Sequence, residues 1–139
     1  MKAYEFEIPG KPGTKQRPRF NRQTGRTYTP KETSSYEAQV VDFFLRKYPE
    51  HVPVITPVRM TIMAFYPIPA SWSKKKKQAA MRGEIFPGKP DWDNVGKIIS
   101  DALNEVAYKD DSQIYQCTIA KMYSDRPRVF VQITTFEGG

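Results

Sequence analysis

The sequence predicts a single two-layer α+β domain, in which helices pack on a four-stranded mixed β-sheet. The 139 residues suffice for one domain with a substantial core. Apolar residues alternate with polar ones near both ends of the chain and in its middle, and they follow helical spacing between those stretches. The predicted order is therefore β-α-β-α-α-β-β. No repeat or linker divides it, so residues 1–139 are expected to form one domain.

The first half of the chain opens with a predicted strand over residues 2–8, followed by a loop over residues 9–28 that proline and glycine punctuate. A helix comes next, because Thr29 suits a capping position and Pro30 suits the first helical position. Pro49 ends this helix near Tyr48. The apolar stripe of the helix consists of Tyr36, Val40, Val41, Phe44 and Leu45.

The middle of the chain contains a second strand, which begins at Val58 and whose apolar run predicts cover on both faces. A short basic helix follows, with Ser71 as its candidate cap. The best-defined helix spans residues 94–105, where apolar side chains recur at helical spacing. Strands at about residues 113–123 and 127–136 complete the sheet, and a tight turn joins them.

Charge is distributed unevenly along the chain. The 22 basic residues outnumber the 15 acidic ones, and the formal net charge is +7. Residues 91–111, which we call the acidic island, nonetheless hold six acids and only two bases. A basic body suits a polyanion such as nucleic acid. The island adds a place where a cation could be held against that polyanion.

Composition limits the compartment and the kinds of site. The single cysteine, Cys117, excludes an internal disulfide and a cysteine-based metal site, and within a predicted strand it is expected in the core. Glu5 and Glu7 lie where a signal peptide needs an apolar run. No apolar stretch approaches the ~20 residues of a membrane span. The sequence therefore predicts a cytoplasmic protein without a membrane partner and without a small organic cofactor.

The acidic island holds the candidate active site. Pro90 favours an extended approach to the helix, in which Asp91 and Asp93 point the same way. The loop after the helix could return Asp110 or Asp111 beside them. Three converging carboxylates repel unless they are protonated or a cation neutralises them, and hard oxygen ligands suit Mg²⁺, for which Mn²⁺ can substitute.

Each of these acids also has an ordinary structural explanation. Asp91 or Asp93 taken alone is more often a helix cap, and the pair at Asp110 and Asp111 is more often a solvated turn. Lys97 would form an exposed ion pair with Asp93 or with Asp101, one helical turn away on either side. Together, three acidic positions around one amphipathic helix in a basic chain favour the metal site.

Basic side chains outside the island are candidate DNA contacts. They are Arg17, Arg19, Lys74, Lys75, Lys76, Lys77 and Lys89. The lysine run on its short helix could hold phosphates without reading sequence, or could be a solvated face. Phe20 could stack on an opened base beside Arg19, or could belong to the core. Trp92 is expected to pack beneath the acids, and His51 is expected at the surface.

The motifs of the island resemble the RusA-type Holliday junction resolvases, including related prophage endodeoxyribonucleases. The resemblance is carried by K-P-D-W-D-N at 89–94, Lys97, D-A-L-N at 101–104 and D-D-S-Q-I at 110–114. P-R-F at 18–20 and Y-T-P at 28–30 are similar too. The strongest match covers about 26 residues, and its compound pattern is more specific than any of its parts.

This resemblance implies Mg²⁺-dependent, dimeric cleavage of four-way DNA junctions. The family's essential acids correspond to Asp91, Asp93 and Asp111, which would hold the metal, and its essential lysine corresponds to Lys97. Because a four-way junction has two-fold symmetry, a homodimer with two sites would cut two strands symmetrically during recombination and repair. The alternative is a non-catalytic nucleic-acid-binding module whose aspartates only cap and solvate.

Overall fold

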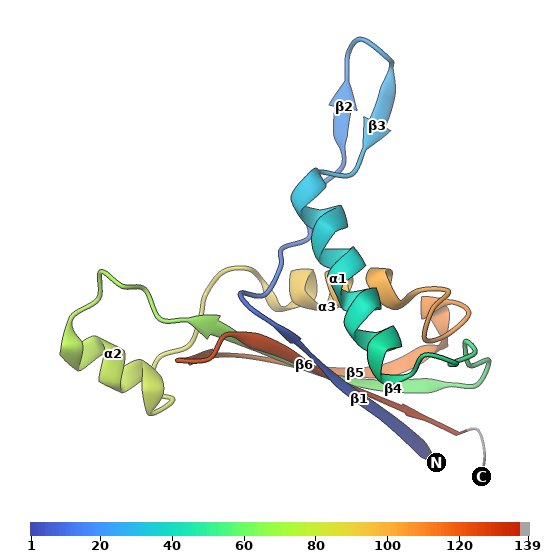
Figure 1. The fold of residues 1–139 in the computed structure, drawn as a ribbon. Coiled ribbons are helices and arrows are strands. Elements are labelled where there is room, and N and C mark those ends of the chain that lie inside the picture. The colour runs from blue at the N-terminus through green and yellow to red at the C-terminus, as the bar shows by residue number, and fades with distance from the viewer. Residues whose placement is uncertain (137–139) are drawn as a thin grey trace.

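The computed structural model describes residues 1–136 and confirms an α+β domain built on a four-stranded mixed sheet (Figure 1). The strands of this sheet are β1 (Lys2–Pro9), β4 (Val58–Pro67), β5 (Ile114–Ser124) and β6 (Arg128–Thr135). Their spatial order is β1-β6-β4-β5, so β1 and β5 form the two edges. The β4–β5 pair is parallel, and the other two pairs are antiparallel.

Two long helices cover one face of this sheet. The helices are α1 (Lys31–Lys47), α2 (Lys74–Met81) and α3 (Trp92–Leu103), and a short 3₁₀ turn, η1 (Asp111–Gln113), precedes β5. Helices α1 and α3 pack against each other above the sheet, whereas α2 stands beyond one end of it (Figure 1). The core lies between the sheet and helices α1 and α3. Its largest fully buried side chains include Ile8, Phe44, Met60, Ile62, Ile98, Ile99, Leu103 and Tyr108.

The opposite face of the sheet is only half covered. Along β4, fully buried residues such as Met60 and Ile62 alternate with half-buried residues such as Met63 and Phe65. The prediction that this strand is covered on both faces is therefore wrong. Its second face is shielded partly by Arg128, whose guanidinium lies 3.8 Å from the centre of the Phe65 ring.

Helix α3 lies very close to the edge strand β5. A Cβ atom added to Gly96 would come within 2.6 Å of Ile119 Cδ1. Five apolar side chains of α3 are buried, in agreement with the predicted helical spacing. The helix begins at Trp92 and ends at Leu103, two residues earlier at each end than the sequence predicts.

The ends of the other two helices differ from expectation in their caps. Helix α1 has Pro30 at its cap position and no side-chain cap, so the assignment of Thr29 is wrong. Helix α2 is capped by Ser73 rather than Ser71, because the Ser73 hydroxyl accepts a hydrogen bond from Lys76 N at 3.2 Å. The end of α1 at Tyr48 agrees with the prediction.

The segment predicted as a long loop contains a small hairpin. Its strands are β2 (Arg19–Asn21) and β3 (Arg26–Tyr28), and they pair antiparallel. Gly25 takes a φ of 69° at the turn, a conformation that glycine adopts without a steric penalty. The hairpin projects away from the sheet, beyond the N-terminal end of α1 (Figure 1).

Two further side chains differ from the sequence predictions. Cys117 is exposed on β5 rather than part of the core, because β5 is an edge strand. His51 is half-buried rather than at the surface, with Nε2 2.9 Å from the carbonyl oxygen of Ala107 and its ring against Tyr4 and Phe44. Within residues 1–136, no helix combines the length and the apolar character that a membrane crossing requires.

Candidate active site

The first two predicted acids lie at the N-terminal end of α3. Asp91 occupies the cap position in extended conformation, as expected after a proline, but its side chain makes no capping hydrogen bond. Asp93 lies within the first helical turn rather than in extended chain, because the helix begins at Trp92. Its Oδ1 accepts a hydrogen bond from Asn94 N at 3.0 Å. Both side chains are exposed at the positive end of the helix dipole, which favours anionic groups.

The two lysines of this region each contact one acid. Lys89 Nζ lies 3.4 Å from Asp91 Oδ1, and Lys97 Nζ lies 3.5 Å from Asp101 Oδ1. The ion pair expected for Lys97 is thus made with Asp101 rather than Asp93. Both lysine side chains are largely exposed, so neither contact contributes much to stability. Their ammonium groups are accessible to an anion beside the acids.

The pair at Asp110 and Asp111 divides into a structural and an available carboxylate. Asp110 caps η1 by accepting a hydrogen bond from Ser112 N at 3.0 Å, while Gln113 completes a capping box. Hydrogen bonding from Ser112 lowers the pKa of the Asp110 carboxyl. Asp111 is fixed through its backbone, because its N–H donates to Asn104 Oδ1 at 2.9 Å. Its exposed carboxylate is not used in that contact.

The structure does not bring these acids together within one chain. Asp111 is bonded to Asn104 at the C-terminal end of α3, whereas Asp93 lies in its first turn. At 1.5 Å per residue, the helix separates the backbones of Asp93 and Asn104 by about 16 Å. Consistently, no group of three His, Cys, Asp or Glu side chains in residues 1–136 lies close enough to hold a metal ion. The expected return of Asp110 or Asp111 beside Asp91 is not observed.

A buried tyrosine, Tyr108, lies beneath the C-terminal half of α3, and nearby acids influence its pKa. The Tyr108 hydroxyl donates to the carbonyl oxygen of Ser100 at 2.7 Å, and the residue is fully buried. Burial raises the pKa of Tyr108 well above its usual value, and the negative charges of Asp111 and Asp101 add to the effect. Tyr108 therefore remains a neutral support for the helix.

The N-terminal loop is tied to the start of α3 by contacts that the sequence did not predict. The Asn94 side chain accepts from Lys15 N at 2.9 Å and donates to Lys15 O. The Lys15 ammonium reaches Asp101 on α3 at 3.1 Å and Glu37 on α1 at 3.3 Å. Burial lowers the pKa of Lys15, but its bonds to these two acids outweigh that effect and raise it. This clamp fixes the base of the hairpin beside the acidic end of α3.

A second unpredicted contact comes from β5. Lys121 Nζ donates to the carbonyl oxygens of Gly88 and Pro90, at 2.9 and 2.8 Å. These two carbonyls lie in the loop that leads directly into Asp91. Both contacts join residues more than 30 positions apart, so no local pattern in the sequence indicates them.

Most of the predicted DNA-binding side chains lie on two projections, whereas Lys89 lies beside Asp91. Arg17, Arg19 and Phe20 belong to the hairpin region, and Phe20 is 61% exposed, which excludes its assignment to the core. The lysine run lies on α2, where Lys76 Nζ sits 4.0 Å from the centre of the Trp72 ring. The hairpin and α2 stand apart from the sheet in different directions (Figure 1). Trp92 is 65% exposed, so it does not pack beneath the acids as predicted.

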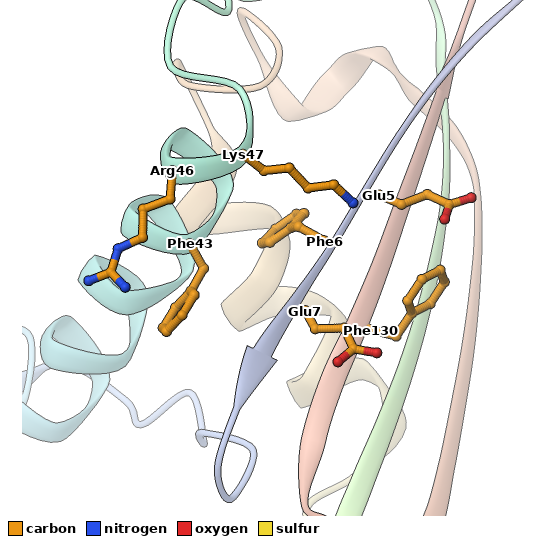
Figure 2. A pocket seen from close by; sticks show the side chains of 7 residues that line it. All are labelled: Glu5, Phe6, Glu7, Phe43, Arg46, Lys47 and Phe130. Carbon is orange, nitrogen blue, oxygen red and sulfur yellow. The ribbon is translucent and has the colours of Figure 1, made fainter.

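Two of the hollows on the surface differ in their relation to the predicted site. One hollow adjoins Asp91 and is also lined by Lys11, Thr14, Lys89 and Asn94. Another lies between α1 and β1, as Figure 2 shows. Its lining consists of Glu5, Phe6, Glu7, Phe43, Arg46, Lys47 and Phe130, and includes none of the predicted site residues.

Comparison with known proteins agrees with the motifs of the acidic island. The family model for the endodeoxyribonuclease RusA matches residues 9–134, which is most of the chain. The chain is also 36% identical over 137 residues to the uncharacterized protein YqaN of Bacillus subtilis (strain 168), and the match covers 96% of each protein. The region matched by the family model includes the hairpin, α2 and both ends of α3. The chain therefore belongs to the RusA family of endodeoxyribonucleases.

Proposed function

We propose that this protein is a Mg²⁺-dependent endonuclease that resolves four-way DNA junctions by symmetric phosphodiester hydrolysis in recombination and repair. The observation that carries the proposal is the presence of exposed carboxylates at the two ends of one helix in an otherwise basic protein of this family. A basic surface attracts the DNA backbone, and a cation bound by these carboxylates would offset their repulsion of it.

The donor chemistry of these acids fits a magnesium ion, with Mn²⁺ as a substitute. Asp91, Asp93 and Asp111 offer hard carboxylate oxygens, which Mg²⁺ prefers. When bound, the ion would lower the pKa of a water molecule and offset charge that develops on the scissile phosphate. One chain supplies two of these acids at one end of α3 and the third at the other end, so one chain does not complete the set.

A homodimer that pairs through β5 would complete it. Among the strands of residues 1–136, β5 is an edge strand that pairs only with β4, so its other side offers N–H and C=O groups for pairing. Helix α3 runs antiparallel to β5, since its start is tied to Lys121 and its end to Asp111. Two β5 strands paired about a two-fold axis run in opposite directions. Asp111 of one copy would then approach Asp91 and Asp93 of the other.

The remaining predicted residues have roles around this composite site. The Lys97 ammonium, exposed one turn beyond Asp93, would stabilise negative charge on the phosphate in the transition state. Arg17 and Arg19 near the hairpin and Lys74–Lys77 on α2 would hold the arms of the junction by their phosphates. Lys89, whose ammonium lies beside Asp91, would contact the strand that enters the site.

A synthetic mobile four-way junction with Mg²⁺, analysed on a denaturing gel, tests the activity. We expect paired, symmetric nicks from the wild-type protein. Asp91→Asn, Asp93→Asn and Asp111→Asn should each abolish cleavage while they preserve junction binding, because each carboxylate repels phosphate rather than holding it. Intact strands despite tight binding by the wild type would instead indicate the non-catalytic binding module.

Mixing inactive variants tests whether two chains share each site. In a mixed dimer of Asp91→Asn and Asp111→Asn chains, a shared site retains one complete set of acids, so co-refolded protein should nick one strand. Asp91→Asn mixed with Asp93→Asn is the matched control, because every shared site then carries a defect. Activity in the control, or none in the first mixture, would contradict a site divided between chains.

A further inference from the structure

Lys121 directs its ammonium group to backbone carbonyl oxygens rather than to an acidic side chain. Its side chain rises from β5 on the face that carries α3, since Lys121 is in register with the buried Ala64 of β4. The residue is half-buried, and no acid within residues 1–136 lies within ion-pairing distance of it. Partial removal of an ammonium group from water costs free energy unless polar groups compensate it.

That compensation comes from the loop that precedes α3. Two of the three ammonium hydrogens are used by the carbonyl oxygens of Gly88 and Pro90. The Pro90 carbonyl belongs to the peptide bond that joins Pro90 to Asp91, so this contact fixes the backbone of the first acid.

The other side of the acid pair is fixed independently. The Asn94 side chain holds the backbone of Lys15 through two hydrogen bonds, and so anchors the residue that follows Asp93. Lys121 and Asn94 therefore hold the chain immediately before and immediately after the two acids. Removal of one contact leaves the other, so the fold does not depend on Lys121 alone.

We propose that Lys121 is a positioning residue, which holds Asp91 in place for the divalent cation from the adjoining strand. This inference rests on the proposed function, because it assigns Lys121 a role toward the metal of that site. Groups that orient metal ligands without touching the metal typically influence affinity by about 10- to 100-fold. An isolated surface lysine would have no such influence.

Lys121→Met tests the proposal, because methionine retains the unbranched chain and loses the charge and the donors. We expect Mn²⁺ affinity, measured by calorimetry, to fall by about tenfold or more. Amide hydrogen exchange in residues 88–92 of the metal-free protein should become faster. Lys121→Arg, which can donate to both carbonyls, should restore both measurements in large part.

Lys47→Met is the matched control, because Lys47 is an exposed lysine at the far end of α1, away from the proposed ligands. It should leave Mn²⁺ affinity and loop exchange unchanged. Unchanged loop exchange and unchanged Mn²⁺ affinity in Lys121→Met would overturn the positioning role, even with a lowered melting temperature. No Mn²⁺ binding by the wild type would overturn the proposed metal site itself, and loop exchange would still decide whether Lys121 holds the loop.

Discussion

We expect Lys97 to affect the rate of cleavage far more than the stability of the fold. Its interaction with Asp101 is long and exposed, so Lys97→Ala should change the free energy of unfolding by less than about 0.5 kcal/mol. Removal of a positioned charge that stabilises a transition state should slow cleavage of prebound junction by ~10²-fold or more. Single-turnover rates at saturating enzyme measure that step without a contribution from binding.

The comparison for this variant is Lys47→Ala, which removes an exposed lysine at the far end of α1. We expect Lys47→Ala to cleave at the wild-type rate. A normal single-turnover rate for Lys97→Ala, accompanied by a lower melting temperature, would assign Lys97 a structural role only.

Individual residues also show where prediction from sequence stops. The choice of Asp111 over Asp110 as the available acid is supported by the capping role of Asp110. Side-chain chemistry favours an interior position for Trp92 and Cys117, yet both are exposed. Their exposure depends on which strand forms an edge and on where a helix begins, and neither is encoded in the residue itself.

At the scale of elements, the lysines of α2 provide a test of the DNA surface. Replacement of Lys74–Lys77 by glutamine should weaken binding to all DNA shapes, because fewer counterions are released. The slope of log affinity against log salt should become shallower by about one for each phosphate that these lysines neutralise. Cleavage at saturating protein should persist. An unchanged affinity and slope would mean that the lysine run is a solvated face and that DNA binds elsewhere.

The main elements are predictable because their patterns are local. Helix α3 and strands β1 and β6 each carry an apolar period over eight or more residues, and β4 carries a continuous apolar run. The hairpin escapes prediction because strands of three residues are too short to show alternation. The hydrogen bonds made by Asn94 and Lys121 join segments that are far apart in the sequence, so the periodicity of the sequence does not predict them.

At the scale of the whole molecule, buried tyrosines limit stability at alkaline pH. Burial raises the pKa of both Tyr36 and Tyr66 to about 12, above the ordinary value of 10.0. The stability that depends on their protonated form is complete below the unfolded pKa and is lost as pH rises through the folded pKa. The free energy of unfolding, measured by urea titration, should therefore fall between about pH 10 and about pH 12. Tyr66→Phe should lose less over that interval, and an equal loss would contradict this origin.

The twelve-residue length of α3 has a consequence for how the protein behaves in a cell. If the proposed metal ligands at opposite ends of this helix are shared between two copies, cutting would depend on the concentration of dimers rather than of single chains. At low abundance the protein would then occupy DNA without damaging it, and activity would rise with the square of its amount. The length of α3 would thus restrict DNA cleavage to protein concentrations at which dimers form.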